Sequence, residues 1–562
     1  MIGDAPLMTF SKRSILFSLL VNILNQRGVK MKKIIFVDTE TKGLYGKLLL
    51  GGVKKDGQFY FFDKEDEMKQ FLTDMIEQGY VIVGHNLFYD FYILDFIPPN
   101  RDSFDDTYLF TKAYQVELKI TEPNRGAFGL ENLCEYFGLY KYKSDKNKIR
   151  KNLERGVATL NDDIKFYLIE DLNATELLYQ RTIAQYNKFK PVYILDKAFL
   201  IRLLQIQQRG VPFDLEQARQ RLQEITTIFN QNQSSFRRTY GFNPFSPSQV
   251  ASKLKLPDAQ KQTLLYTYFT TKDQKLKQCI QDILALKKQQ DEVASLRDWV
   301  SRCKDGYIYG HFDVCGSITG RLSCNNPNLL NIPRHLKFLF YKKPFLKFDF
   351  SQIELRLAGQ IYNIPTFIQA YQKKEDLHTK TASFLFDKPI EQITKEERHI
   401  AKQFNFALIY GASPRALQEI LLEANITLTF DETSYLRTKW FSFHKKVKEH
   451  IDTIANSLKN GSIPVFTVLG RNRYTEHLNI ALNFPIQGTG AELLKGTVVL
   501  FTKKYPNARI VNLIHDEIQI ECETIEEAKE YADALIQCGK EMWYFFFKDP
   551  QIDFEGEFEI IS

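Results

Sequence analysis

The sequence lacks the paired cysteines and the long apolar runs that mark several classes of protein. Its seven cysteines include no C-x-x-C pair, so neither a zinc site nor a disulfide framework is indicated. No apolar run approaches the ~20 residues that a membrane span requires. We therefore expect an intracellular, cytoplasmic protein that works in a reducing environment, away from membranes.

The sequence also has little excess of one sign of charge. The formal net charge is +7 over 562 residues, which suits a polyanionic partner without requiring one. Hydrophobic residues make up 44% and aromatic residues 14% of the chain, which indicates a folded protein and not a disordered one. The length exceeds what one hydrophobic core supports and predicts about three or four domains.

Residues 1–30 form a candidate N-terminal extension. An apolar stretch at 14–24 follows Lys12 and Arg13 in the order of a signal peptide, but it lacks an obvious small-residue cleavage site. Met31 would itself make a natural first residue. We favour an extension with a short helix packed on the first domain over a targeting peptide.

One acid stands out in the second half of the chain. Residues 345–350 form an apolar, aromatic run that predicts a buried strand, and 352–360 has the spacing of a helix start. Asp349 is the only acid in that strand and falls where the strand ends. Burying an unpaired carboxylate costs several kcal/mol or shifts its pKa, so this position needs an explanation.

Asp516 is a second acid of the same kind. The β-rich runs on either side of it predict a hairpin with Asp516 at its tip. Either acid alone is best interpreted as an ordinary satisfied or solvent-facing carboxylate. If the hairpin lies beside the strand of Asp349, however, the two carboxylates converge, and oxygen-only ligands of this sort suit Mg²⁺ or Mn²⁺. Two such ions can clamp an in-line phosphoryl transfer.

The N-terminal third contains a similar pattern. Asp38 and Glu40 end an apolar strand two positions apart, so alternation along the strand puts both on one face within reach of one metal ion. A second strand leads into a helix that carries Asp90 near its start. Tyr167 and Asp171 lie one turn apart on a helix face. A lone D-x-E pair is common on surfaces and carries little weight.

The order of these motifs resembles that of family A DNA polymerases, the DNA polymerase I family. Residues 349–356 resemble motif A, residues 515–517 resemble motif C, and residues 398–411 between them resemble motif B, the nucleotide-binding helix of the fingers. The N-terminal D-x-E, N-x3-D and Y-x3-D motifs resemble the DEDD exonuclease superfamily in the form found in proofreading polymerases. Ordered motifs are far more specific than any one of them.

The resemblance implies two metal-dependent sites. Asp349 and Asp516 would hold two Mg²⁺, or Mn²⁺ in their place, while a primer 3′-OH attacks the α-phosphate of a dNTP. A second pair of Mg²⁺ would serve phosphodiester hydrolysis, with Tyr167 orienting the attacking water. The implied ligands of that second pair are Asp38, Glu40, Asp90 and Asp171.

Motif B can also be argued from helix geometry. Arg398, Lys402 and Phe406 are spaced i, i+4, i+8 and form one stripe along a helix. Two cations for a triphosphate and an aromatic ring beside the sugar and base make a nucleotide cradle. An ordinary solvated helix face would also carry Arg and Lys but would rarely add Phe406 and Tyr410.

Further contacts are implied by the resemblance. Residues 319–334 resemble a palm element whose arginine, here Arg321, contacts the minor groove near the primer terminus. Glu354 matches the residue that blocks a ribose 2′-OH and implies deoxynucleotide substrates, and Phe406 implies discrimination against dideoxynucleotides. The other implied substrate contacts are Gln352, His378, Tyr410, Asn483, Gln487, His515 and Glu517.

The fold class expected from the resemblance is α/β (α+β) and multidomain. An RNase H-like exonuclease domain is followed by a polymerase shaped like a right hand. The expected ranges are 1–30 for the extension, 31–190 for the exonuclease domain, 191–306 for a mostly helical thumb, 307–360 and 485–562 for the palm, and 361–484 for the fingers.

A basic cluster lies between the second and third exonuclease motifs. It either guides a single strand through phosphate contacts or is a solvated loop, and the sequence does not decide between these. Its members are Lys141, Lys143, Lys146, Lys148, Arg150 and Lys151.

We expect a template-directed DNA polymerase with 3′–5′ proofreading and, because no flap-nuclease pattern precedes residue 31, without a 5′–3′ exonuclease. Its partners would be primer-template DNA, dNTPs and a single-stranded 3′ end. The chain would act as a monomer, with a processivity partner left open. A nuclease-only enzyme on a decayed polymerase scaffold and a nonenzymatic DNA-binding protein are the alternatives. The intact Asp349, Lys402 and Asp516 argue against both.

Overall fold

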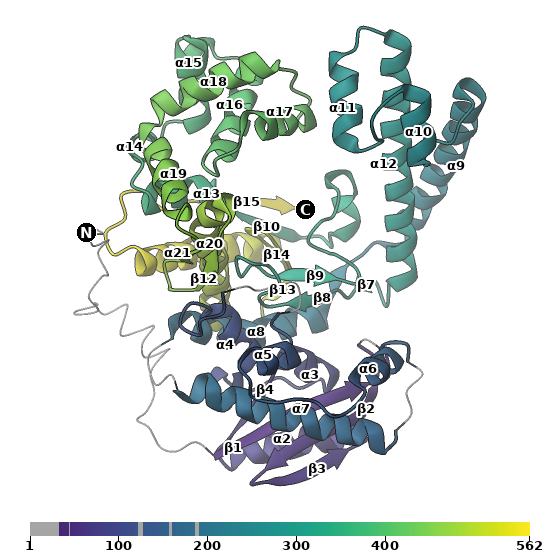
Figure 1. The fold of residues 1–562 in the computed structure, drawn as a ribbon, viewed down its shortest axis with the longest axis vertical. Coiled ribbons are helices and arrows are strands. Elements are labelled where there is room, and N and C mark those ends of the chain that lie inside the picture. Colours follow the sequence, from purple (N-terminus) through teal and green to yellow (C-terminus); the bar gives the residue numbers. More distant parts are fainter. Residues whose placement is uncertain (1–32, 44, 122–126, 157–159, 186–189) are drawn as a thin grey trace.

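The computed structural model describes residues 33–43, 45–121, 127–156, 160–185 and 190–562. A lower α/β domain supports an upper part in which two helical groups rise from a central sheet (Figure 1). The helix expected within residues 1–30 lies outside the described residues. Within the described ranges, no helix combines the length and the apolar character needed to span a membrane.

The N-terminal domain is a mixed sheet covered by helices. Its elements are β1 (Lys33–Thr41), β2 (Leu48–Lys55), β3 (Gln58–Phe62), α2 (Glu65–Glu77), β4 (Tyr80–Gly84), α3 (Leu87–Ile93), η1 (Arg101–Ser103), β5 (Phe104–Asp106), α4 (Thr107–Ala113), α5 (Leu130–Tyr136), α6 (Lys146–Glu154), α7 (Asp162–Arg181) and η2 (Ile183–Gln185). The strand order is β3-β2-β1-β4-β5. Strand β1 runs antiparallel to β2 and parallel to β4. The two strands and two helices expected here are confirmed.

Two consecutive glycines let helices close on both faces of this sheet. A Cβ on Gly51 would lie 2.1 Å from the sulfur of Met68 on α2, and one on Gly52 would lie 2.9 Å from Leu168 on α7. Successive strand residues face opposite sides, so α2 and α7 cover opposite faces. Asp38 pairs with Gly52 across β1 and β2, which places Asp38 on the face covered by α7.

The upper part is built on a second, antiparallel sheet of order β13-β14-β10-β15. The elements of this base are β8 (His311–Asp313), β9 (Ser323–Asn325), η3 (Arg334–Phe340), β10 (Phe345–Phe350), α13 (Ile353–Ile361), α20 (Leu478–Lys504), β13 (Arg509–Ile514), β14 (Glu517–Glu521), α21 (Ile525–Phe546) and β15 (Gly556–Ile561). The apolar side chains of β10 are buried, whereas Asp349 is exposed. The predicted strand, the helix after it and the hairpin around Asp516 are confirmed.

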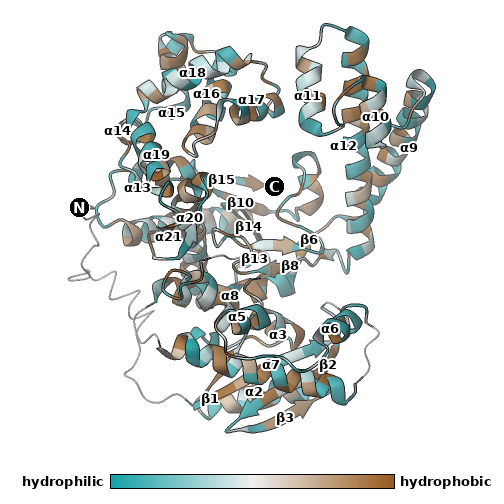
Figure 2. Ribbon diagram, viewed as in Figure 1, coloured by the Kyte–Doolittle hydropathy of each residue, from teal (hydrophilic) through white to brown (hydrophobic). Residues whose placement is uncertain are grey.

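One helical group projects from this base as a long arm. It consists of α9 (Leu215–Tyr240), α10 (Pro247–Leu254), α11 (Lys261–Thr270) and α12 (Gln274–Arg302), anchored by the small sheet of β6 (Val211–Pro212) and β7 (Tyr307–Ile308). The arm has its own small core, which includes Phe236, Val250 and Ile280. Figure 2 shows α12 mostly in the colour of hydrophilic residues, as expected for a helix with so much exposed surface.

The other helical group faces the arm across the molecule. It consists of α14 (Pro365–Gln372), α15 (Leu377–Phe386), η4 (Ile390–Gln392), α16 (Lys395–Leu408), α17 (Pro414–Glu423), α18 (Phe430–Phe443) and α19 (Lys445–Leu458), followed by the hairpin of β11 (Ile463–Phe466) and β12 (Asn472–Thr475). The two groups meet where Lys261 of α11 lies 3.4 Å from Glu423 of α17 (Figure 1).

Two of the expected domain boundaries need correction. Helix α8 (Pro191–Arg209) was assigned to the helical arm, but it packs against α20, β13, α3 and α4 between the N-terminal domain and the second sheet. Most of its side chains are buried, including Phe199, Leu200 and Leu203, because it is covered on both sides. The boundary between 484 and 485 falls inside the continuous helix α20.

A buried ion cluster ties α8 to α20 and to the turn between β11 and β12. Asp196 of α8 accepts hydrogen bonds from Arg471 and Lys495, each at 2.7 Å, and its side chain is fully buried. Burial alone would raise the pKa of Asp196, but the two cations hold it below its usual range. Glu492 completes the cluster, 3.4 Å from Arg471.

We predict that Lys495→Met destabilises the protein strongly, because it leaves a buried carboxylate with one cation fewer. Breaking a buried pair costs about 3–5 kcal/mol, which denaturant unfolding followed by fluorescence would measure. Lys504→Met is the matched control on the same helix, since Lys504 pairs with Glu541 at the surface and exposed pairs contribute about 0–1 kcal/mol. Equal effects of the two changes would contradict the prediction.

Candidate active sites

The acids predicted from the C-terminal motifs lie in one open pocket of about 1060 Å³. Asp349 of β10 and Asp516 of the hairpin turn both line it, and His515 before Asp516 adopts a left-handed φ of 57°. The opposite wall is helix α16, which contributes Arg398, Lys402 and Phe406. Acidic and basic residues therefore line the same space, as the family resemblance implied.

Strand register explains why the acids gather. Asp349 of β10 pairs with Glu517 of β14 on one side and with Glu557 of β15 on the other. Directly paired residues share a face of the sheet, so three carboxylates stand in a row beside Asp516. Lys337 lies 3.5 Å from Glu517, and Arg321, Arg334 and Lys347 line the same pocket.

The pKa values of these acids reflect that crowding. Desolvation by the surrounding pocket walls, followed by the charges of Asp516, Glu517 and Glu557, raises the pKa of Asp349 to about 7 although its side chain reaches solvent. The pKa of Asp516 is also raised, mainly by burial. Oxygen donors that repel one another in this way fit a divalent cation, because the cation replaces the protons that the acids would otherwise keep.

The basic wall is already ordered by its neighbours. The capping box of Thr394 and Glu397 begins α16. Arg398 donates two hydrogen bonds to Asp376, at 2.7 and 3.0 Å. Any anion that binds Arg398 must therefore share it with Asp376 or displace Asp376, a contact that the sequence did not predict.

The predicted histidine is held on the same wall. His378 is buried, with Nδ1 3.0 Å from the side-chain nitrogen of Asn405, and its ring lies 5.8 Å from that of Phe406. Burial lowers the pKa of His378 to about 4. At neutral pH the ring is therefore uncharged and acts as a hydrogen-bonding group, leaving Arg398 and Lys402 as the cations of this wall.

Glu354 connects the two walls. Its carboxylate accepts hydrogen bonds from Arg321 and from the hydroxyl of Tyr410. Arg321, Glu354 and Tyr410 thus form one chain of contacts, of which Arg321 and Glu354 line the pocket. The two hydrogen bonds hold the carboxylate of Glu354 in one position at the wall of the pocket.

Three other predicted contacts lie at the margins of this pocket. Gln352 lines it and accepts a hydrogen bond from Tyr371 at 3.1 Å. Asn483 and Gln487 are half-buried on α20 and do not line the pocket. The side-chain oxygen of Asn483 is buried without a hydrogen-bond partner, so it retains a free acceptor.

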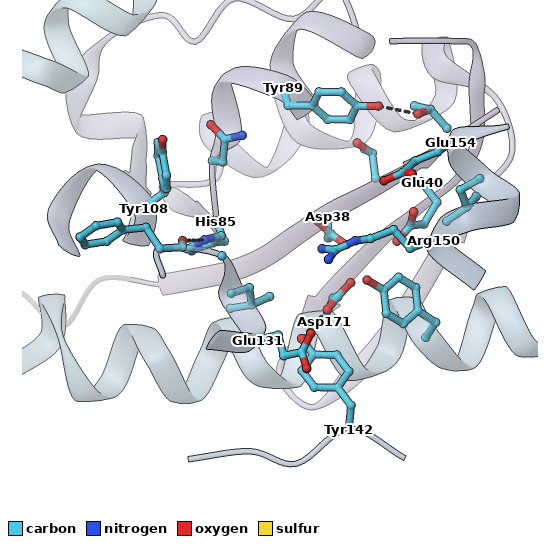
Figure 3. A pocket seen from close by; sticks show the side chains of 18 of the residues that line it. Asp38, Glu40, His85, Tyr89, Tyr108, Glu131, Tyr142, Arg150, Glu154 and Asp171 are labelled. Atoms are coloured by element: carbon cyan, nitrogen blue, oxygen red, sulfur yellow. Dashed lines mark hydrogen bonds between the residues drawn. The ribbon is translucent and has the colours of Figure 1, made fainter. Parts of the chain in front are cut away.

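A second pocket, of about 550 Å³, lies in the N-terminal domain (Figure 3). One carboxylate oxygen from each of Asp38, Glu40 and Asp171 lies within 4.8 Å of the others. Strand β1 supplies the first two on the face covered by α7, and α7 supplies the third. The register of β1 with β2 and the packing of α7 therefore bring together three of the four predicted ligands.

Asp90 is the exception. It lies outside the three-acid group, is buried, and accepts a hydrogen bond from the hydroxyl of Thr39 at 2.6 Å, yet it is near enough to raise the pKa of Asp38 and Glu40. Burial raises the pKa of Asp90 to about 7 and that of Asp171 to about 6. Burial and neighbouring acids also raise the pKa of Asp38 and of Glu40 well above their usual values.

Aromatic and basic residues complete this pocket, and some of them were missed. Tyr167 lines it as predicted, whereas Tyr142, which donates a hydrogen bond to Asp171, was not singled out. An aromatic residue between Lys141 and Lys143 was the only available signal.

The predicted basic cluster adopts a defined structure. The carboxylate of Glu170 on α7 accepts hydrogen bonds from the backbone N–H groups of Lys143 and Ser144, at 2.7 and 3.1 Å. Part of the cluster lies on helix α6, and Figure 3 shows the guanidinium of Arg150 pointing toward the acids. Arg150 thus lies on a helix and not in a loop, but it is exposed, and a role in guiding a strand stays a prediction.

The two pockets are joined by a loop of the upper part. Gly316 lines the N-terminal pocket, and Asp313 accepts a hydrogen bond from Tyr108 of α4 at 2.8 Å. Lys112 of α4 donates to the carbonyl of Cys315. The same loop continues to Arg321 in the other pocket. The upper part thus supplies one wall of the N-terminal pocket.

Comparisons with known proteins agree with this architecture. A profile of DNA polymerase family A matches residues 214–542. DNA polymerase I of Aquifex aeolicus is 35% identical over 402 residues, which cover 68% of this chain and 69% of the relative. DNA polymerase I of Borreliella burgdorferi is 25% identical over an alignment of 573 residues, which covers 90% of this chain and 60% of the relative.

One solved structure shares the fold over nearly the whole chain. The POL domain of Pol1 from M. smegmatis, in complex with DNA primer-template and dNTP, is similar with a TM-score of 0.75 at 20% identity. The match covers 94% of this chain and 95% of that one. This likeness shows the fold, and the profile match and the Aquifex relative show the family: the chain belongs to DNA polymerase family A.

Proposed function

We propose that this family A polymerase extends a primer on a DNA template and removes mismatched 3′ ends in a separate exonuclease site. The observation that supports extension best is the pocket in which the acids of β10 and the hairpin face the cations of α16. Attack on a nucleoside triphosphate needs these two features opposite each other.

In this proposal β10, the hairpin and α20 belong to the palm, α14–α19 to the fingers and α9–α12 to the thumb. Asp349 and Asp516 would hold divalent cations, Mg²⁺ or Mn²⁺, and their oxygen donors fit such ions. Bound there, these ions supply Lewis-acid activation of the 3′-OH and charge stabilisation at the phosphates. Glu517 and His515 flank the ligands at the hairpin turn.

The fingers helix positions the nucleotide. Lys402 and Arg398 pair with the triphosphate, Arg398 after exchange with Asp376, and Phe406 and Tyr410 pack against the sugar and base. Glu354, held by Arg321 and Tyr410, excludes a ribose 2′-OH by filling its space. Arg321, Asn483 and Gln487 offer hydrogen-bonding groups to the minor groove of the primer end, where acceptors occur in every correct pair.

The N-terminal domain is proposed to be an RNase H-like 3′–5′ exonuclease. Three carboxylates within 4.8 Å of one another support this, as does the mixed strand order with acids at the edge of β1. Asp38, Glu40 and Asp171 would share two cations with Asp90 beside them. Tyr167 orients the attacking water, and Arg150 faces the phosphate of a single-stranded 3′ end.

Primer extension on a gel tests both activities. The enzyme is given Mg²⁺ and a primer with a mismatched 3′ end, with and without dNTPs. We expect trimming without dNTPs and extension with them. Asp516→Ala should raise the activation free energy of extension by several kcal/mol, which lowers its rate on the order of a thousandfold or more. The rate of trimming should stay unchanged. Asp38→Ala should show the reverse. Trimming alone in every lane would favour a nuclease-only enzyme.

We predict that Mg²⁺ stabilises the protein more at pH 8 than at pH 6. Asp349 and Asp90 have a raised pKa of about 7, so at pH 6 protons compete with the cation. Without Mg²⁺ these acids retain protons that the unfolded chain releases. Stability without metal should therefore fall as pH rises from ~4 toward 7. Thermal melting with and without Mg²⁺ measures both effects.

Two variants, Asp349→Asn and Asp38→Asn, test whether this Mg²⁺ effect comes from the two candidate sites. Each should lose part of the Mg²⁺-dependent rise in melting temperature, because each removes an anionic ligand from one site. An equal rise at both pH values, or a rise unchanged in both variants, would show that Mg²⁺ acts elsewhere.

We predict that Phe406→Tyr relaxes discrimination against dideoxynucleotides. Phe406 lines the nucleotide pocket, and a hydroxyl there would supply a hydrogen bond that a sugar without its 3′-OH lacks, contributing about 1–3 kcal/mol. The ratio of dideoxynucleotide to deoxynucleotide incorporation should rise about tenfold or more. Competition assays read this ratio directly, and an unchanged ratio would remove Phe406 from the sugar-binding role.

A further inference from the structure

A third pocket lies apart from both candidate active sites and shares no lining residue with them. It has a volume of about 470 Å³ and opens where the loop before η1, helix α8 and the end of α20 meet. That volume is within the ~300–1,000 Å³ of typical ligand pockets. The pocket is therefore large enough to receive a ligand or a segment of another protein.

Its walls combine cations with aliphatic surface. Arg101, Arg202 and Lys503 line it, together with Ile97, Pro98, Pro99, Ile201 and Leu500 among others. The side chain of Arg101 is only 12% exposed, and the nearest carboxylate, Asp102, lies 3.8 Å away and is 70% exposed. Arg101 also borders a small apolar cavity of about 30 Å³ that reaches Met542 and Phe545.

The cations here are poorly compensated. Arg202 is half-buried in the middle of α8, and its guanidinium donates a hydrogen bond to the neutral side chain of Gln205 at 3.2 Å. No carboxylate among the described residues forms an ion pair with Arg202 or Lys503 within 4.0 Å. Burial alone lowers the pKa of Arg202. Lys503 lies in the last turn of α20, where the helix dipole favours a cation. Arg202 lies in the middle of α8, where the helix dipole does not favour a cation.

The lining also indicates what kind of anion fits. No aromatic side chain lines the pocket, so bases of single-stranded DNA or a nucleotide find no stacking surface. An oxyanion beside an aliphatic group matches both parts of the wall, because half-buried guanidinium groups bind carboxylates well and the aliphatic floor gains from apolar contact.

We propose that this pocket docks an acidic peptide segment of a partner protein that carries an aliphatic side chain among its Asp and Glu residues. Arg202, Arg101 and Lys503 pair with the carboxylates, and the aliphatic side chain lies against Ile201, Pro98 and Leu500. A segment bound there touches the N-terminal domain and the palm at once. It therefore tethers the polymerase to its partner without obstructing either candidate active site.

Fluorescence anisotropy tests this with the full-length protein and a short fluorescein-labelled peptide that alternates Asp or Glu with Leu. We expect binding that weakens about tenfold or more in Arg202→Glu and in Lys503→Glu, as for other desolvated ion pairs at interfaces. Arg415→Glu is the matched control, because Arg415 is 86% exposed on another face. Replacing Leu by Gly in the peptide should also weaken binding.

Primer extension by Lys503→Glu should match that of the wild type, which shows that the exposed substitution leaves the fold intact. Failure of any peptide to bind would overturn the proposal. So would equal binding by all variants. Displacement of the peptide by pyrophosphate or single-stranded DNA, with no dependence on Leu, would assign the pocket to phosphate groups instead. Loss of catalysis by Asp516→Ala has no bearing on this result, so the two proposals fail separately.

Discussion

The antiparallel register of β10 with β14 and β15 is the constraint on which the upper part depends. It sets Asp349 directly between Glu517 and Glu557, with Asp516 in the adjoining turn. Like charges paired across strands destabilise a sheet, and here the buried apolar residues of β10 hold them together. The carboxylates crowded there have oxygen donors that fit divalent cations, and the cations of α16 line the same pocket.

The N-terminal domain follows the same logic with different parts. There the register of β1 with β2 puts Asp38 opposite Gly52, and the missing side chain of that glycine lets α7 approach with Asp171. In both domains an interior apolar strand carries acids toward its carboxyl end, and a neighbouring element completes the site. Like-charge repulsion is tolerated because the surrounding packing is extensive.

The two sites are held at a fixed separation by buried polar contacts. The Asp196 cluster joins α8 to α20, and Tyr108 bonds Asp313 on the loop that leads to Arg321. These contacts join the N-terminal domain, through α4 and α8, to the part of the chain that carries the other pocket.

Local patterns predicted much of this and failed where distant contacts decide. The strand of Asp349, the hairpin of Asp516 and the stripe on α16 were predictable, since hydrophobic periodicity and turn residues encode them. The position of α8 was not, because an amphipathic pattern does not reveal which two domains cover a helix. Three of the unpredicted contacts join side chains from segments far apart in sequence. They are the contacts of Thr39 with Asp90, of Tyr142 with Asp171 and of Asp376 with Arg398. The spacing of residues within one element does not predict such contacts.

The most direct test of the central claim is to locate the cations themselves. Crystals of the protein with primer-template DNA and an unreactive dNTP analogue would be soaked in Mn²⁺, and anomalous scattering would be recorded. The account predicts density within about 2.0–2.6 Å of carboxylate oxygens of both Asp349 and Asp516. Density bound only by Glu517 and Glu557, or none in this pocket, would contradict it.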